Sequence, residues 1–330
     1  MRSEVAAPPS TRERISMHLT EATKGFEIYM LAAGRSPHTV QLHKYTIRRL
    51  AEYLNDPDVT AITTADLQAF LAYWGQSHAS SSVRRFWTGI RSFFRWAASE
   101  FNILNPSLAI PAPKSANRVI HPLTHEEISK LLDACSRTAP ANTQHRRSFT
   151  MPRSTAKRDR ALILLLLDTG IRISEAARLT LGDVDLDNGE IIIRPYGSGE
   201  KSRARVLPIG NRTRRALWHY IASRTDTKED PDPDSLSLFV DKTEDHALDR
   251  HGLRQLLNRL GERASVPNVH PHRFRHTFAI EYLRNNGDVF TLQRILGHRT
   301  LTMVERYLEI AQADVKTAHR RASPVDRWRL

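Results

Sequence analysis

Cysteine is nearly absent from this sequence, and so are long apolar runs. Cys135 is the only cysteine among 330 residues, which excludes an internal disulfide and a zinc site built from cysteines. The longest apolar run, 161–167, is far too short to cross a bilayer, and the N-terminus lacks the apolar core of a secretory signal. Only 14 Gly and 17 Pro are present, as in an ordinary globular protein. We therefore expect a cytoplasmic protein with no membrane partner.

Acidic residues are too few to balance the basic ones. The chain has 49 Lys and Arg against 36 Asp and Glu, a formal net charge of +13. Each DNA phosphate that Lys or Arg neutralises releases condensed counterions and so drives binding. Nucleic acid is therefore the first partner to expect, with association to the nucleoid. Charge alone leaves open the alternative of a basic surface that binds nothing in particular.

The length is sufficient for two domains, each with its own core. The pattern along the chain predicts a mainly helical protein with a small β-sheet. We expect a disordered leader at 1–13, a helical DNA-binding domain at 14–103, an extended linker at 104–120, a catalytic domain at 121–312 and a basic C-terminal tail at 313–330.

The N-terminal domain is predicted to contain four or five helices. Ser36 is a good N-cap and Pro37 suits the first helical position, so a helix should begin there. A later helix, 81–99, has a wide aromatic face, and Arg84, Arg91 and Arg95 fall on its other side. We expect these arginines to contact the DNA backbone. The alternative is that they are simply its solvated face.

The second half of the chain contains several local signals. The sequence THEE at 124–127 is a capping box that opens a helix, and the apolar helix after 160 should end at Gly170. Residues 189–209 read as a β-hairpin that turns near Gly197 and Gly199. The first part of the basic stretch 138–160 is expected to be a flexible surface insertion that could touch DNA.

Six polar residues in the catalytic half form a set suited to chemistry on a phosphodiester. Each has an ordinary explanation when taken alone; Tyr307, for example, lies at helical spacing from Val304 and Leu308 and could be a core tyrosine. Together they offer a nucleophile, anion-binding groups and proton-handling groups. In chain order they are Arg172, Lys201, His272, Arg275, His298 and Tyr307.

Three histidines, His270, His272 and His276, also suggest a metal site, because positions 272 and 276 share a helix face. Arg273 stands where a zinc protease has its glutamate, and cationic neighbours disfavour a dication. We expect neither a metal nor a cofactor.

In this order the six residues resemble those of the tyrosine recombinases of the phage integrase and Xer type. The matching motifs are TGIRISE at 169–175, Lys201 in the hairpin turn, HRFRH at 272–276, and LGH at 296–298 followed by Tyr307. One departure is Ser198, which takes a hairpin position that is often lysine. The resemblance implies a SAM-like helical core-binding domain followed by an α-rich catalytic domain of the tyrosine recombinase type.

The resemblance also assigns roles that fit the residue types. Two guanidiniums, Arg172 and Arg275, would hold the non-bridging phosphate oxygens with directed, charge-assisted hydrogen bonds, and His298 would donate another. Tyr307 would be the nucleophile of a 3′-phosphotyrosyl intermediate. His272 would accept its proton and Lys201 would protonate the departing 5′-oxygen.

The implied function is site-specific DNA recombination, either integration and excision or dimer resolution. The partners would be double-stranded DNA and three further copies of the chain, in a tetramer on two DNA sites, with a paralogous recombinase as an optional partner. The basic tail would pack into a neighbouring copy. Two alternatives remain open: a type IB topoisomerase-like enzyme that relaxes DNA, and a non-catalytic DNA-binding protein with the same fold.

Overall fold

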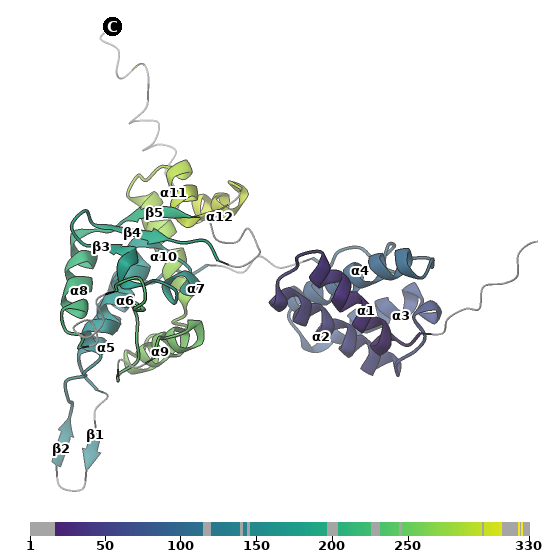
Figure 1. The fold of residues 1–330 in the computed structure, drawn as a ribbon, viewed down its shortest axis with the longest axis horizontal. Helices are drawn as coiled ribbons and strands as arrows, with labels where there is room; N and C mark the ends of the chain where they lie inside the picture. Colours follow the sequence, from purple (N-terminus) through teal and green to yellow (C-terminus); the bar gives the residue numbers. More distant parts are fainter. Residues whose placement is uncertain are drawn as a thin grey trace, which may run out of the picture. The chain divides into compact units, whose positions relative to one another are not determined.

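A computed structural model describes residues 17–114, 120–138, 141–143, 146–196, 204–225, 232–243, 246–298, 300–311, 323 and 325. The leader 1–13, nearly all of the tail 313–330 and the hairpin turn with Lys201 lie outside this part. The chain divides into two compact units that meet in the sequence at residues 118 and 119. Both are mainly helical (Figure 1), which confirms the predicted fold class. No helix in the described ranges has the length and apolarity needed to span a membrane.

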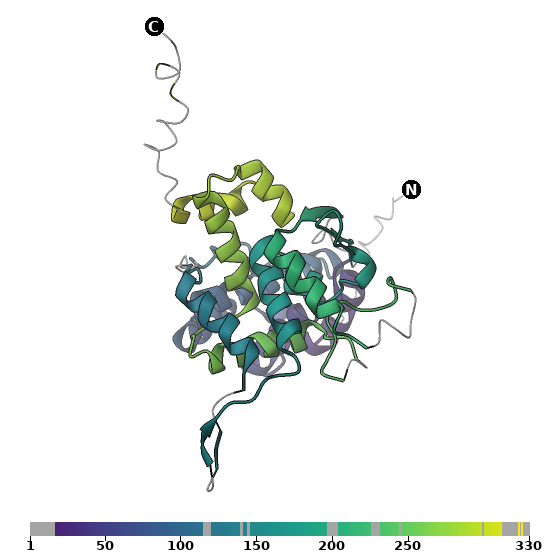
Figure 2. The same ribbon diagram turned by 90° about the vertical axis from the view of Figure 1, so that its left-hand side faces the viewer.

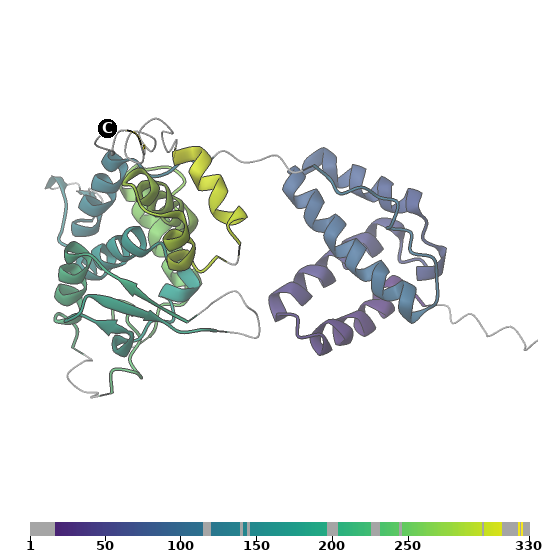
Figure 3. The ribbon, with the colours of Figure 1, turned by 90° about the horizontal axis from the view of Figure 1, so that it is seen from above.

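The N-terminal unit is built from helices packed around an aromatic core. Phe93 meets Phe26 edge-on with ring centroids 5.4 Å apart, and Phe70 meets Phe86 in the same way at 5.7 Å. The longest of the helices, α4, crosses the others (Figure 3). The helices are α1 (Leu19–Ala32), α2 (Pro37–Leu54), the 3-10 turn η1 (Val59–Ala61), α3 (Thr64–Ser77) and α4 (Ser80–Glu100).

The start of α2 follows the predicted cap. The hydroxyl of Ser36 accepts a hydrogen bond from the backbone N–H of Thr39 at 3.3 Å, and Pro37 is the first helical residue. The Ser36 hydroxyl thus satisfies one of the N–H groups that have no partner at the helix start. Pro37 suits the first position because it has no N–H that would need a partner there.

Residues 104–110, expected to belong to an extended linker, pack against the N-terminal helices. The indole N–H of Trp87 donates to the carbonyl of Ile110 at 3.1 Å, and the hydroxyl of Thr64 donates to the carbonyl of Pro106 at 2.9 Å. Because the Ile110 side chain is buried in the aromatic core, this segment closes the N-terminal unit.

The catalytic unit surrounds one buried helix, α6 (Ala156–Thr169), which contacts α5 (His125–Ser136), α8 (Asn211–Ile221) and α10 (Pro271–Arg284). Residues 161–163, 165 and 166 of α6 are almost entirely inaccessible, and Leu164 is partly buried. As predicted, α6 ends at Gly170, which has a φ of 59°. A Cβ atom there would also collide with the ring of Phe278, so both conformation and packing require glycine.

A three-stranded antiparallel sheet covers one side of this core, in the order β3-β4-β5. Its strands are β3 (Val184–Asp185), β4 (Glu190–Ile193) and β5 (Arg205–Pro208). Ile191 pairs with Leu207, and both side chains are buried against the helices. Both strands of the hairpin predicted for residues 189–209 are therefore present.

Within the stretch 138–160, the described residues contain regular structure that the sequence did not predict. The backbone of β1 (Ala141–Thr143) and β2 (Arg146–Phe149) forms an antiparallel hairpin that projects from the catalytic unit (Figures 1 and 2). Further on, the carboxylate of Asp159 pairs with Arg153 at 2.6 Å and with Arg158 at 2.8 Å. Because Asp159 and Arg158 are buried, these charges anchor the start of α6.

The remaining elements complete the catalytic unit and carry most of the candidate site. They are α7 (Ile173–Ala176), the 3-10 turn η2 (Leu181–Asp183), α9 (Arg250–Arg263), α11 (Val289–Leu296) and α12 (Thr302–Ala311).

Candidate active site

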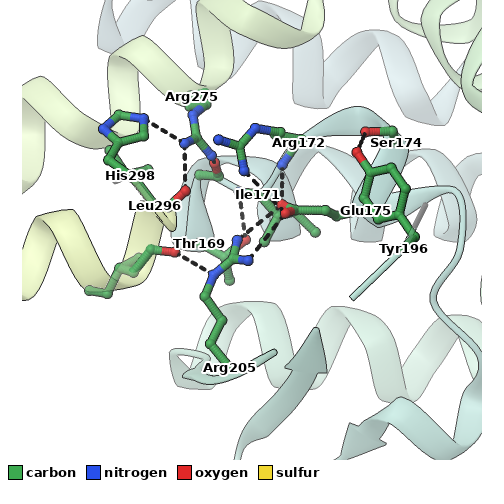
Figure 4. A network of polar contacts seen from close by, with 12 residues as sticks. Thr169, Ile171, Arg172, Ser174, Glu175, Tyr196, Arg205, Arg275, Leu296 and His298 are labelled. Atoms are coloured by element: carbon green, nitrogen blue, oxygen red, sulfur yellow. Dashed lines mark hydrogen bonds and ion pairs between the residues drawn. The ribbon is translucent and has the colours of Figure 1, made fainter. Parts of the chain in front are cut away.

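The predicted site residues come from separate elements of the catalytic unit. Arg172 precedes α7, His272 and Arg275 lie on α10, His298 follows α11, and Tyr307 lies on α12. Contacts among these elements bring Arg172, Arg275, His298 and Tyr307 into one region, and Figure 4 shows the first three of these residues. Lys201 belongs to the turn outside the described residues, so its position stays a prediction.

Arg275 is a buried cation held by neutral groups. Its guanidinium donates to the carbonyl of Gly170 at 2.7 Å and to the carbonyl of Leu296 at 2.6 Å, and one Nη lies 2.8 Å from Nε2 of His298. Burial, reinforced by the nearby charge of Arg172, lowers the pKa of Arg275 to about 10, so it remains protonated at neutral pH. No carboxylate among the described residues pairs with it, which leaves a fixed positive charge for an anion.

His298 completes this arrangement as a neutral imidazole. Burial and the charge of Arg275 lower the pKa of His298 to about 4. Because Nε2 then accepts from Arg275, the proton of the ring is on Nδ1. That nitrogen is buried and has no hydrogen-bond partner within the described ranges. Nδ1–H of His298 is thus available to donate a hydrogen bond, and its predicted role toward a phosphate oxygen stays a prediction.

Arg172 is positioned by the carboxylate of Glu175, whose side chain is completely buried. The carboxylate accepts from the backbone N–H of Arg172 at 2.8 Å and from its guanidinium at 3.3 Å. Arg205 on β5 approaches the same carboxylate with two N–H groups, at 3.1 and 3.0 Å (Figure 4). Burial by itself would raise the pKa of Glu175, but the hydrogen bonds and charge of Arg205 outweigh it and lower the pKa. The carboxylate therefore stays ionised.

Arg205 also connects the carboxylate of Glu175 to the C-terminal end of α11. Its Nε donates to the carbonyl of Ile295 at 2.8 Å, at the end of α11. Gly297 has a φ of 63°, and a Cβ there would lie 3.3 Å from the Arg205 guanidinium. The Arg205 side chain thus links Glu175, which orients Arg172, to the turn that carries His298.

Tyr307 is buried, with 6% of its surface exposed. Its ring stacks on that of His298 with centroids 6.4 Å apart and planes 12° from parallel. Its hydroxyl lies 2.9 Å from Nδ1 of His276. Burial raises the pKa of Tyr307, although the charge of Arg275 opposes this. The phenol is therefore protonated at rest.

His272, predicted to accept the tyrosine proton, lies one turn before His276 on α10, with the two ring centroids 6.3 Å apart. It is exposed, and desolvation together with the charges of Arg275 and Arg172 lowers its pKa. The structure thus puts His276, not His272, in hydrogen-bond contact with Tyr307. The role of His272 stays a prediction.

Two participants were not recognised from the sequence. In the sequence His276 is the last residue of the motif at 272–276 and one of the three histidines of the disfavoured metal site, and it is not among the six candidates. Arg205 is not among them either. Its contacts with Glu175 and Ile295 make it part of the support beneath Arg172.

The three arginines predicted to contact DNA, Arg84, Arg91 and Arg95, belong to the N-terminal unit. Arg84 and Arg95 are exposed, and the guanidinium of Arg91 lies 5.3 Å from the ring centroid of Trp87. All three lie on α4 outside the aromatic core. Their contact with DNA stays a prediction.

The catalytic site thus combines a tyrosine hydroxyl, an uncompensated guanidinium and neutral imidazoles. This chemistry suits the transfer of a phosphoryl group to tyrosine, because the added negative charge meets fixed positive charge. The class is a phosphoryl transferase with a tyrosine nucleophile.

Comparison with known proteins identifies the family. Residues 121–314 match the phage integrase family and residues 24–100 match the phage integrase N-terminal SAM-like domain. The chain is 31% identical to the tyrosine recombinase XerC of Oceanobacillus iheyensis, over 90% of this chain and 94% of that protein. It is 28% identical to the tyrosine recombinase XerA of Thermococcus kodakarensis, over 93% of this chain and 97% of that one.

The fold matches solved structures as well. The Tn1549 transposon integrase, in complex with a circular intermediate DNA, superposes with a TM-score of 0.70 at 18% identity, covering 92% of this chain and 100% of that chain. The protein described here belongs to the phage integrase family of tyrosine recombinases, which cleave and rejoin DNA.

Proposed function

We propose that this protein is a site-specific DNA recombinase that cleaves and rejoins strands through a 3′-phosphotyrosyl link to Tyr307. The observation that carries the proposal is the contact of His298 with both the ring of Tyr307 and the buried guanidinium of Arg275. Nucleophile and anion-binding groups thereby belong to one site. The curated relatives are themselves tyrosine recombinases.

The proposed reaction begins when Arg172 and Arg275 take the non-bridging oxygens of the scissile phosphate. The Nδ1–H of His298 adds a third hydrogen bond. Tyr307 then attacks phosphorus as its phenolic proton passes to a neighbouring imidazole, and the 5′-oxygen leaves with a proton from Lys201. One phosphoester replaces another, so a hydroxyl from a partner strand can reverse the step without ATP. Strand exchange follows when that hydroxyl belongs to a second duplex.

The proposed assembly is four copies of the chain on two double-stranded DNA sites, with a paralogous recombinase as an optional partner and the tail 313–330 packed into a neighbouring copy. A place at the nucleoid follows from this substrate. Arg84, Arg91 and Arg95 on α4 would contact the DNA backbone, supported by the net charge of +13. Metal and cofactor have no part in these steps.

The test is to incubate the protein with nicked suicide duplexes made from the ends of its host element. We expect an SDS-resistant protein–DNA adduct with the wild type and none with Tyr307→Phe, which lacks only the attacking oxygen. DNA affinity should be nearly the same for both proteins in a gel-shift titration. Adduct formation by Tyr307→Phe at the wild-type level would refute the assignment of the nucleophile.

Two further assays separate the alternative functions. Exchange between two labelled duplexes is expected of a recombinase, whereas relaxation of supercoiled DNA without exchange would indicate a topoisomerase-like enzyme. A non-catalytic binder would shift the duplex in a gel but form no adduct.

A further inference from the structure

The hydroxyl of Tyr307 has a specific partner that the family motif does not assign. Nδ1 of His276 lies 2.9 Å from it, and the two rings have centroids 5.6 Å apart. Tyr307 comes from α12 and His276 from α10, so the contact joins two helices. Within the described ranges, His276 is the residue that touches the atom that would react.

The protonation states of the two groups allow Tyr307 to donate this hydrogen bond. Burial lowers the pKa of His276 to about 4, helped by His272 and His270 and by the charges of Arg275 and Arg306. The imidazole is therefore neutral at pH 7, while the phenol keeps its proton. In the imidazole tautomer with its hydrogen on Nε2, Tyr307 donates and Nδ1 accepts, which is the geometry that precedes a proton transfer.

We propose that His276 is the catalytic residue that accepts the proton of Tyr307 during DNA cleavage, while the exposed His272 contacts the scissile phosphate. The inference rests on the proposed function. In the step, the phenolic proton moves to Nδ1 of His276 as the Tyr307 oxygen bonds to phosphorus. The bond from phosphorus to the 5′-oxygen breaks, and that oxygen takes its proton from Lys201.

The surroundings of His276 make this transfer depend on the substrate. The facing groups are His270 at the N-cap of α10, His272 and Arg275 on α10, and Arg306 and Tyr307 itself on α12. Arg275 and Arg306 are cationic, so without DNA they oppose a positive charge on His276. A phosphate bound by Arg275 brings a negative charge that offsets them and raises the pKa of His276. The base thus becomes effective when the phosphate is in place.

A competing explanation is that the hydrogen bond to His276 only holds the Tyr307 side chain in its buried position until DNA binds. The two roles predict different effects on the cleavage rate. Removing a hydrogen bond that only holds the side chain would speed cleavage or leave it unchanged, whereas removing the proton acceptor would slow it. The variant His276→Asn is suited to the test because its side-chain amide oxygen can still accept from the hydroxyl but cannot take the proton.

The experiment measures single-turnover adduct formation on nicked duplexes from pH 5 to 9, for the wild type, His276→Asn, His276→Ala and His272→Asn. We expect both His276 variants to be slower by about a hundredfold, with unchanged DNA affinity. At pH 7, where the imidazole is largely neutral in both the folded and the unfolded chain, His276→Asn should also keep the wild-type thermal unfolding temperature. The wild-type rate should fall at acid pH, and this fall should be absent in His276→Asn. His272→Asn is expected to be slower yet to keep the fall, because its proton acceptor remains.

A duplex with sulfur at the 5′ bridging position distinguishes protonation of the leaving group from deprotonation of Tyr307. A thiolate leaves without needing a proton, so this substrate should restore cleavage by Lys201→Ala but not by His276→Asn. Restoration of His276→Asn, or cleavage by either His276 variant at more than a tenth of the wild-type rate, would overturn the proposal. Absence of an adduct with the wild-type protein would instead reject the recombinase function itself.

Discussion

At the scale of single residues, the main feature is the buried guanidinium of Arg275. Its hydrogen bonds go to the carbonyls of Gly170 and Leu296 and to the imidazole of His298, and none of these acceptors carries a charge. A buried cation is costly unless an anion compensates it. The folded protein therefore holds an unpaired charge that a DNA phosphate would neutralise, so binding energy is directed to the phosphate under attack.

This arrangement predicts that Arg172→Ala and Arg275→Ala each slow cleavage on the order of a hundredfold or more, because each removes donors aimed at the charge that grows during attack. Single-turnover adduct formation measures the effect. Arg275→Lys is the matched control: it keeps a positive charge but cannot reach three separate acceptors as the planar fork does. Near-normal cleavage by Arg275→Ala would contradict the role of the guanidiniums as a phosphate clamp.

At the scale of elements, β5 contributes Arg205, a residue that holds parts of the candidate site together. Arg205 joins the carboxylate of Glu175, at α7, to the carbonyl of Ile295, at the end of α11. Arg172 and the turn that carries His298 are each next to one end of this link. Their separation is therefore set by a side chain that does not itself touch the phosphate in the proposed mechanism.

We predict that Arg205→Met lowers the free energy of unfolding by about 3 kcal/mol, because it removes the two hydrogen bonds that Arg205 gives to a buried carboxylate. Cleavage should fall as well, since Arg172 loses its fixed partner. Chemical denaturation and adduct formation measure the two effects. In the double variant Arg205→Met, Glu175→Gln the carboxylate is neutral, so much of the stability should return while cleavage stays slow. Recovery of both together would mean that Arg205 acts on stability alone.

At the scale of the whole molecule, the catalytic unit contains imidazoles that stay neutral in the folded state. The pKa values of His276 and His298 are lowered from about 6.5 to about 4. Between those values the unfolded chain binds protons that the folded chain does not. The free energy of unfolding must therefore fall as pH falls from about 6.5 to about 4.

We predict a loss on the order of 2–3 kcal/mol for each imidazole over that range, at about 1.4 kcal/mol for each unit of pKa shift. Thermal unfolding of the full chain from pH 7.5 to 5, above the range where carboxylates titrate, measures the part of this loss that occurs above pH 5. His276→Asn and His298→Asn should each flatten the dependence. An unchanged slope in both variants would show that other groups cause the acid sensitivity.

Much of the fold was predictable because its signals act over a few residues. The Ser36 cap, the capping box at 124–127, the end of α6 at Gly170 and the two strands of the later hairpin all follow from neighbouring side chains and backbone preferences. The hairpin of β1 and β2 was not predicted, because that basic stretch has no apolar alternation to indicate strands.

The order and spacing of residues predicted the mainly helical class and a set of six residues suited to phosphodiester chemistry, a set without His276 and Arg205, because each prediction depends on residue type or on a local pattern. Tertiary structure alone decided which groups touch. His276 meets Tyr307 from 31 positions away, and Arg205 meets Glu175 from 30 positions away. Such pairs form where helices and strands pack, so no periodicity along the chain reveals which imidazole reaches the hydroxyl.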